Sequence, residues 1–420
     1  MFLNSNTITK REGVAAMFSN NNRISTRQVF RLFVFDFIGM STLVLPAKLA
    51  GATGCDGVFS IVIGGILSTL YLWYLVRIMQ GMDGDLITYT KAELPRWGAV
   101  VMLVFFTIYC IFEAGYSAYI FADVMKKGLI GGESYTLLLI LILAVAAYAI
   151  QSGIESRARV YEILFWVLLV PLFLLLWIAA SDTTPEYLGA FLTTPVSNMV
   201  WGGTRVFHYL TPVFLILFFP AYIRKDAGKK MTAAVLAALW TAVIVFAVFY
   251  LILIGSFGDR AMARMQYPAL TLMSNIHLRG SFLKRLDAFL LAIWFFTLFA
   301  LINVFLFYAE QLIAAIAGLM RKTSYHETTD AAEAGKKETV TSKKHGSRQK
   351  YKRYGKSRNK VWTTIVAVAL VFVVAECFCY GSFAEWFEGY KAYVAVPLLI
   401  LLPLVILLWG KAIWHGKKKS

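Results

Sequence analysis

The sequence predicts an all-α integral membrane protein with ten transmembrane helices. Hydrophobic residues make up 59% of the 420-residue chain, and the mean hydropathy is +0.65. A soluble protein of this size would be insoluble with such a composition. About 20 consecutive apolar residues span the core of a bilayer. Ten such segments are expected, at 28–50, 57–79, 97–124, 134–154, 157–180, 203–223, 231–257, 286–318, 361–380 and 391–414.

The positive charge of the chain is concentrated in alternate loops. The net charge is +17, and residues 321–360 alone hold 13 Lys or Arg against 4 Asp or Glu. Short loops predicted on the same side of the membrane carry most of the remainder. This is the positive-inside pattern of membrane proteins, so both termini are expected in the cytoplasm and no nucleic-acid partner is expected. No signal peptide is expected in the polar first 27 residues.

This pattern divides the chain into five parts. They are a polar cytoplasmic N-terminus at 1–27, helices one to eight at 28–320, a basic cytoplasmic loop at 321–360, helices nine and ten at 361–414, and a basic tail at 415–420. The loop is rich in Lys, Ser and Gly and poor in large aliphatic residues, so we expect it to be disordered. Its charge suits contact with anionic lipids; a solvated linker without a specific partner is the alternative.

The first apolar segment differs from a plain membrane anchor. Arg31–Lys48 carries Asp36 near its middle, Gly39 beside it and Pro46 further along. An acid at this depth usually faces a cavity or a partner, and loosened backbone is tolerated in a membrane only where it lines a cavity. Discontinuous helices hold small ligands in many transporters. We therefore expect an unwound centre at Phe37–Thr42; a kinked helix with a buried acid and no ligand is the alternative.

An unwound centre would provide a site for a small solute. Its free N–H groups suit a carboxylate and its free carbonyls suit an ammonium group, while Gly39 would allow close approach. Ser41 and Thr42 would add hydroxyls, although such hydroxyls also bond to carbonyls of their own helix. With three cavity walls from later helices, the predicted substrate-binding residues are Phe37, Gly39, Ser41, Thr42, Tyr209, Thr211 and Trp294.

Two acids, Asp36 and Glu113, are predicted nearest the membrane midplane. Either could couple a proton, since burial favours the neutral form of a carboxyl group, or could meet an ammonium group of the solute. The structural alternatives are an ion pair of Asp36 with Arg31 and hydrogen bonds of Glu113. The hydrogen-bonding candidates for Glu113 are Tyr109, Tyr116 and Tyr119.

The two halves of the chain show a weak sequence similarity to each other. Helix one ends in LVLPAKL and helix six in LFFPAYI, so Pro46 and Pro220 occupy similar places. Thr211 and Pro212 lie mid-span in helix six and predict a second break. Five spans precede helix six. Broken helices one and six would therefore open the halves of a 5+5 inverted repeat.

Three connections have patterns of their own. Residues 81–96 suit a short amphipathic segment, and 183–202 suit an outer loop lying at the membrane interface. Residues 259–284 contain YPALTLMSNIHL, which is broken at Pro268, too polar to span the membrane and too apolar for a free loop. This stretch predicts a lid or re-entrant segment, with a simple surface loop as the alternative.

Enzyme chemistry has no support in the sequence. We find no nucleophile–base pair, phosphate-binding glycine loop or metal-ligand cluster, so no catalytic residue, metal or cofactor is expected. The four cysteines, Cys55, Cys110, Cys377 and Cys379, form no disulfide or zinc framework.

Several motifs together resemble the B-subunit of spore germinant receptors, a branch of the amino acid–polyamine–organocation transporter superfamily. They are ISTRQ at Ile24–Gln28, FDFIGMSTLVLP at Phe35–Pro46, Pro220, YPAL at Tyr267–Leu270 and FLKRLDAFLLAIWFF at Phe282–Phe296. The resemblance covers roughly 24–320 and 361–414. It implies a LeuT-like fold, the spore inner membrane, an A-subunit and a C-subunit lipoprotein as partners, and a small nutrient as germinant. The chain departs from the family in TPVFLILFFP, which lacks the acid often present in helix six.

Three functions are therefore weighed. The first is a germinant-sensing subunit that binds a small solute of the amino-acid class and signals to its partners. The second is a permease that moves an amino acid or polyamine together with a proton. This hypothesis rests on Asp36. The third is a membrane scaffold with a vestigial cavity.

Overall fold

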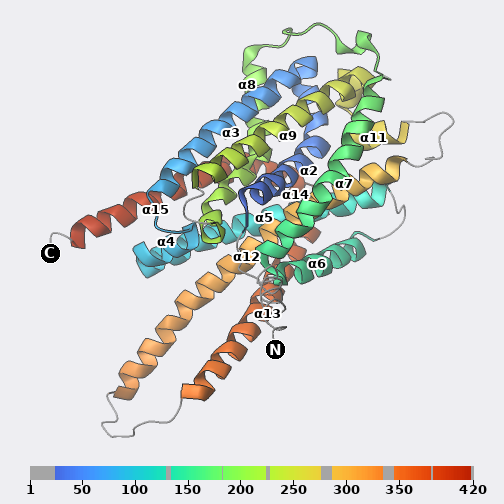
Figure 1. The fold of residues 1–420 in the computed structure, drawn as a ribbon. Helices are drawn as coiled ribbons and strands as arrows, with labels where there is room; N and C mark the ends of the chain where they lie inside the picture. The colour runs from blue at the N-terminus through green and yellow to red at the C-terminus, as the bar shows by residue number, and fades with distance from the viewer. Residues whose placement is uncertain are drawn as a thin grey trace, which may run out of the picture.

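The computed structural model describes residues 24–128, 134–181, 183–223, 228–275, 286–333, 345–379 and 382–417, and all regular structure in these ranges is helical. The helices form one elongated bundle with α2 near its centre (Figure 1). The main helices are α2 (Thr26–Thr53), α3 (Gly57–Gln80), α5 (Arg96–Gly128), α6 (Tyr135–Gln151), α7 (Gly153–Ser181), α8 (Val196–Tyr209), α9 (Gly228–Phe257), α12 (Leu286–Glu333), α13 (His345–Phe378), α14 (Phe383–Tyr390) and α15 (Val396–Lys417).

Each predicted span contains a helix, but the count of ten stays a prediction. In the described ranges, eight helical segments are long and apolar enough to cross a membrane. One of them, Thr26–Gln80, contains both α2 and α3, which are joined by the short 3-10 helix η1 (Gly54–Asp56). Tyr135–Gln151 is apolar but shorter than the others. The chain is therefore a multi-pass membrane protein.

Local sequence explains where helix one begins and where it ends. The Ser25 hydroxyl accepts a bond from the Gln28 N–H at 3.3 Å, and the Gln28 side chain accepts one from the Ser25 N–H at 2.9 Å. This reciprocal capping box satisfies two backbone donors that a helix start leaves free. The helix ends before Gly54, whose φ of 52° disfavours other residues.

The predicted unwinding of helix one at Phe37–Thr42 is wrong. The α2 helix is continuous from Thr26 to Thr53, with Pro46 inside it. The Ser41 hydroxyl donates to the Phe37 carbonyl at 2.5 Å and the Thr42 hydroxyl to the Ile38 carbonyl at 2.8 Å. These back-bonds are the alternative that the sequence left open, and they occupy carbonyls that a ligand would have needed.

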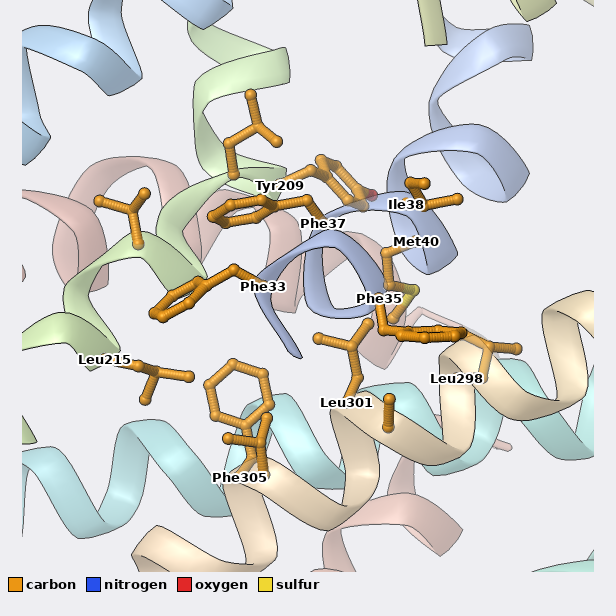
Figure 2. Close-up of a cluster of buried hydrophobic side chains, with 14 of the residues drawn as sticks. Phe33, Phe35, Phe37, Ile38, Met40, Tyr209, Leu215, Leu298, Leu301 and Phe305 are labelled. Atoms are coloured by element: carbon orange, nitrogen blue, oxygen red, sulfur yellow. The ribbon is translucent and has the colours of Figure 1, made fainter. Parts of the chain in front are cut away.

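Packing explains why helix one stays wound despite its glycine. A Cβ added at Gly39 would lie 3.0 Å from the Thr297 Cβ of α12, so the glycine serves a helix contact instead of a ligand. Figure 2 shows Phe33 and Phe37 directed toward Leu215 and Tyr209, with Leu298 and Leu301 of α12 flanking the helix elsewhere. A central helix buried on all sides gains most of its stability from these contacts.

The predicted break of helix six is present. The α-helical part, α8, ends at Tyr209, and a 3-10 helix, η3 (Thr211–Tyr222), continues the chain. Pro212 has no N–H and cannot bond to the His208 carbonyl four residues earlier. The Thr211 hydroxyl donates to that carbonyl instead, at 2.8 Å. Thr211 is fully buried, so this replacement bond satisfies an acceptor that water does not reach.

The predicted connecting segments are mostly short helices. Residues 81–96 contain α4 (Leu86–Glu93), and the outer loop at 183–202 contains the 3-10 helix η2 (Pro185–Leu188). The Asp56 carboxylate accepts bonds from the backbone N–H groups of Leu192 at 2.5 Å and Thr194 at 2.8 Å. These bonds hold the outer loop against the junction of α2 and α3.

The predicted lid at 259–284 contains two short helices, α10 (Asp259–Met262) and α11 (Pro268–Asn275). The α11 helix packs against α2, α9 and α12. Residues 276–285 of this prediction lie outside the described residues.

Helix extends into both ends of the basic loop, and the disorder of this loop stays a prediction. The α12 helix continues to Glu333 and α13 begins at His345, and the two run side by side beyond the other helices (Figure 1). Residues 334–344 lie outside the described part. Ala, Glu, Lys and Arg are good helix formers, and extending an existing helix avoids the unfavourable nucleation step. A membrane span can therefore propagate into a polar segment that would not fold alone.

Candidate solute-binding site

A polar cavity lies between α2, α5, α8 and the start of helix ten. Its volume is about 640 Å³. The α14 helix runs directly into a π-helical turn, η5 (Lys391–Ala395), and both contribute to the wall. The lining residues are Leu45, Lys48, Tyr116, Trp201, Thr204, Arg205, His208, Tyr209, Phe387, Glu388, Lys391, Ala392 and Tyr393.

Glu388 is the central acceptor of this cavity. Its Oε1 forms an ion pair with Lys48 of α2 and accepts bonds from the Tyr116 hydroxyl at 3.3 Å and the Tyr209 hydroxyl at 3.1 Å. Three helices thus meet at one carboxylate oxygen. Among the described residues no donor reaches Oε2, so this oxygen is open to a further cationic or hydroxyl donor.

A second ion pair joins Lys391, which lines the cavity, to Glu113 of α5. The Lys391 ammonium lies 2.5 Å from Glu113 Oε1 and 5.2 Å from the centre of the Tyr209 ring. Lys391 is 6% exposed and Glu113 is 4% exposed, and a buried charge of either sign requires such a partner. The sequence did not indicate Lys391, and of the three tyrosines predicted as partners, Tyr109 lies within interaction range of Glu113. Lys391 opens a π-helical turn, a distortion that is frequent at functional sites.

Arg205 gives the cavity an unbalanced positive charge. Lys48 and Lys391 each face a carboxylate, whereas Arg205 is exposed and has no ion-pair partner in the described ranges. Guanidinium groups recognise carboxylates through two parallel hydrogen bonds. With Glu388 across the cavity, the site offers one free acceptor and one free cation, which are the groups that a zwitterionic solute needs.

Of the predicted substrate-binding residues, only Tyr209 lines this cavity. Phe37, Gly39, Ser41 and Thr42 are buried in the packing around helix one and are not among the residues that line this cavity. Thr211 is also buried, and the Tyr109 hydroxyl lies 3.0 Å from its Oγ1. Either hydroxyl could donate in this pair, and Tyr109 is the donor whenever the Thr211 proton is donated to the His208 carbonyl.

Trp294 lies at a different cavity, of about 380 Å³, beneath α11. Its indole N–H donates to the Thr42 hydroxyl at 3.2 Å, which joins α12 to helix one. The cavity is lined by Lys127, Gly128, Met265, Gln266, Tyr267, Leu270, Thr271, Ser274, Leu291 and Trp294.

Asp123 fastens the segment before α11 to the bundle. This carboxylate is 1% exposed and accepts from the Tyr267 and Tyr135 hydroxyls, both at 2.7 Å, and from Gln266 at 3.0 Å. Lys127 pairs with it at 2.8 Å. Burial, followed by the charge of Asp123, raises the pKa of Tyr267 above its ordinary value, so this phenol stays a donor.

Asp36 is held by a partner that the sequence did not indicate. Its Oδ1 lies 2.8 Å from Arg157 Nη2, and the two residues are 2% and 7% exposed. The same guanidinium nitrogen lies 3.4 Å from the Ala300 carbonyl. The predicted alternative, a pair with Arg31, is wrong because Arg31 pairs with Glu162 at 2.9 Å.

The charged residues that form the cavity were missed for a simple reason. Lys48, Glu388 and Lys391 lie at the ends of apolar segments, where charges usually flank a span. Lys48 and Glu388 are 340 positions apart, so the pattern of either segment alone carries no sign of their contact. In the described ranges, no group of three or more His, Cys, Asp or Glu side chains could hold a metal ion.

Related proteins align with most of the chain. Residues 23–325 match the family described as spore germination protein. Spore germination protein YndE of Bacillus subtilis (strain 168) is 21% identical over 299 residues, which are 70% of this chain and 81% of that protein. Spore germination protein KB of the same strain is 26% identical over 280 residues, which are 64% of this chain and 71% of that protein.

Solved transporters have a similar fold. A Na+-coupled sialic acid symporter in a substrate-bound outward-open state matches 92% of this chain and 79% of its own, with a TM-score of 0.60 and 12% identity. Mhp1, a nucleobase-cation-symport-1 family transporter, matches 88% of this chain and 76% of its own, with a TM-score of 0.56 and 12% identity. These likenesses confirm the predicted all-α, LeuT-like fold class.

Proposed function

Because the chain belongs to the family of spore germination proteins, we propose that it is the solute-sensing transmembrane subunit of a spore germinant receptor. The proposed ligand is a small nutrient of the amino-acid class, bound in the cavity around Glu388. In this proposal the protein resides in the spore inner membrane with both termini in the cytoplasm, and it works with A- and C-type subunits.

The observation that carries the proposal is the convergence of three helices on Glu388 Oε1. An incoming ammonium group would compete with Lys48 for the carboxylate, while a carboxylate of the same solute would pair with Arg205. Binding would then change the contacts that join α2, α5 and α8 to helix ten. A ligand shifts a conformational equilibrium only by its difference in affinity between the two states, and exchange of these ion pairs supplies such a difference.

A permease is the second candidate, because the solved proteins of similar fold are transporters by description. Asp36 stays the proton-coupling candidate of this permease. It is buried, and its partner Arg157 keeps its charge at all physiological pH values, so protonation of Asp36 would leave that charge unpaired. Uptake of a labelled amino acid or polyamine into vesicles containing the purified chain distinguishes the permease from a sensor that moves nothing.

The test of the sensor is germination of spores carrying Glu388→Gln. Loss of a charged hydrogen bond weakens binding by about 1.5–3 kcal/mol, which corresponds to roughly ten- to a hundredfold in ligand concentration. The half-maximal nutrient concentration should rise by this factor, while a receptor-independent trigger should act as before. Glu385→Gln is the matched control, because Glu385 is exposed one turn earlier and does not line the cavity. An unchanged nutrient response in spores that contain normal amounts of the variant would refute the site.

A further inference from the structure

A separate cavity of about 500 Å³ lies between α12 and α13, at the end of the bundle that carries the basic segment. It shares no lining residue with either cavity described above. Its lining residues are Glu310, Gln311, Ile313, Ala314, Ala317, Gly318, Arg321, Lys360, Trp362, Thr363 and Val366.

The walls of this cavity form an apolar groove that opens sideways. Ala314, Ala317 and Gly318 follow one another at helical spacing on one face of α12, and a Cβ added at Gly318 would meet nothing within 4 Å. On α13, Trp362 is 61% exposed and Val366 is 41% exposed. In a membrane-spanning segment, such exposed apolar side chains face lipid tails. The groove therefore has the volume and the apolar lining to hold part of an acyl chain.

Two cations mark the polar end of the groove. Arg321 follows the apolar run of α12 and Lys360 precedes that of α13, and both side chains line this cavity. Lys360 donates to the uncharged Gln151 carbonyl at 3.0 Å. Arg321 has no ion pair or hydrogen bond with the part of the chain that the structure describes. These charges are therefore free to bind an anion at headgroup depth.

The one acid in the groove is already engaged. Glu310 accepts from the Thr363 hydroxyl at 2.9 Å and from the Gln311 amide at 3.0 Å, and it is 2% exposed. Eleven positions of helix separate it from Arg321, which is about 16 Å at 1.5 Å per residue. Its charge is therefore distant from Arg321, although it acts on Lys360, so Arg321 would be the main cation for the anion.

We propose that this cavity binds one anionic phospholipid, with its phosphate between Arg321 and Lys360 and an acyl chain along Ala314 and Ala317. Basic pockets between transmembrane helices on the cytoplasmic side bind acidic lipid headgroups in this manner. The basic end of the bundle is the side that the positive-inside rule assigns to the cytoplasm. Such a lipid would hold α12 and α13 together where they leave the membrane. This inference does not depend on solute binding around Glu388.

The experiment compares lipid binding by the purified full chain. The chain in neutral detergent is titrated with phosphatidylglycerol or phosphatidylcholine, and bound lipids are counted by native mass spectrometry. One phosphatidylglycerol should bind more tightly than phosphatidylcholine. The double variant R321Q/K360Q should weaken it about thirtyfold, since each basic residue near a membrane contributes about 1 kcal/mol. Gly318→Leu, which fills the groove without changing charge, should also weaken it.

The matched control is K229Q/K230Q, which removes two exposed cations at the start of α9. It should bind phosphatidylglycerol as the unaltered chain does. Equal binding of the two lipids, or equal losses in the two double variants, would overturn the proposal in favour of a non-specific lipid layer. Competition by inorganic phosphate alone at equal strength would also overturn it, because the site would then recognise a free anion. Folding of each variant is checked by its elution profile and helical content.

Discussion

Arg157 of α7 and Asp36 of α2 form an ion pair at 2.8 Å in which both side chains are more than nine-tenths buried. The Arg157 guanidinium also approaches the Ala300 carbonyl of α12 at 3.4 Å and lies 5.4 Å from the Tyr161 ring centre. A single fixed cation therefore connects helices one, five and eight. Removal of one partner from a buried pair leaves the other charge without compensation, which is more damaging than removal of both.

Asp36→Leu is expected to lower the free energy of unfolding by about 3–5 kcal/mol, because it leaves the Arg157 charge buried and unpaired. The double variant D36L/R157M should recover most of this loss. Thermal unfolding of the purified chain in detergent measures both. The surface pair of Arg27 and Glu162 provides the control, and Arg27→Met should change stability by no more than about 1 kcal/mol. A double variant as unstable as the single one would contradict this account.

Gly39→Val should destabilise the protein by about 1–3 kcal/mol, because its side chain would overpack the contact with Thr297. Thr297→Gly in the same chain should relieve the clash. The control is Gly318→Ala, where the added methyl group meets open space, and helix propensity predicts a gain of about 0.5–1 kcal/mol. If Gly39→Val were instead neutral for stability but abolished solute binding, the ligand site would have to lie at helix one after all.

Thr211→Val should destabilise the break in helix six. It removes the donor to the His208 carbonyl and the acceptor for the Tyr109 hydroxyl, and each buried group left unpaired costs about 1–3 kcal/mol. Thr241→Val is the control, because Thr241 is exposed and bonds only to its own helix carbonyl, that of Ala237. Equal melting temperatures for the two variants would contradict the proposed role of the Thr211 hydroxyl.

Tyr267→Phe should loosen the segment that carries α11, because one of the two phenolic donors to Asp123 is lost. A cysteine placed at Ser274, which lines the cavity beneath α11, reports this opening. The four native cysteines are first replaced by serine. The labelling rate with a membrane-impermeant maleimide should rise several-fold in Tyr267→Phe and stay unchanged in Tyr187→Phe, an exposed tyrosine in η2. Equal rates in all three chains would show that this bond does not hold the segment.

Sequence patterns predict those features of this fold that depend on local chemistry. Runs of about 20 apolar residues mark the helices, and Pro212 marks the break in helix six because a missing N–H has the same effect in any environment. Gly39 shows the limit of this reasoning. A glycine suits both a ligand contact and a close helix contact, and only the position of Thr297, 258 residues away, decides between them.

The candidate site was harder to predict for the same reason. Tyr209 was recognised because an aromatic residue beside a predicted break is a natural cavity wall. Glu388 and Arg205 were not, because a single charge near the end of an apolar segment reads as a flanking residue until its neighbours in space are known. Long-range charge pairing, such as that of Lys48 with Glu388, leaves no periodic trace in either segment.

The 3-10 conformation of η3 makes helix six longer than an α-helix of the same residues would be. Its 12 residues rise about 2.0 Å each and cover roughly 24 Å, whereas an α-helix of the same residues would cover roughly 18 Å. The far end of this segment is tied to the start of helix one by the bond from the Ile24 N–H to the Tyr222 carbonyl, at 3.0 Å. Conversion of this segment from a 3-10 helix to an α-helix would therefore shorten it by about one helical turn. Through the bond to Tyr222, this shortening would displace the start of helix one.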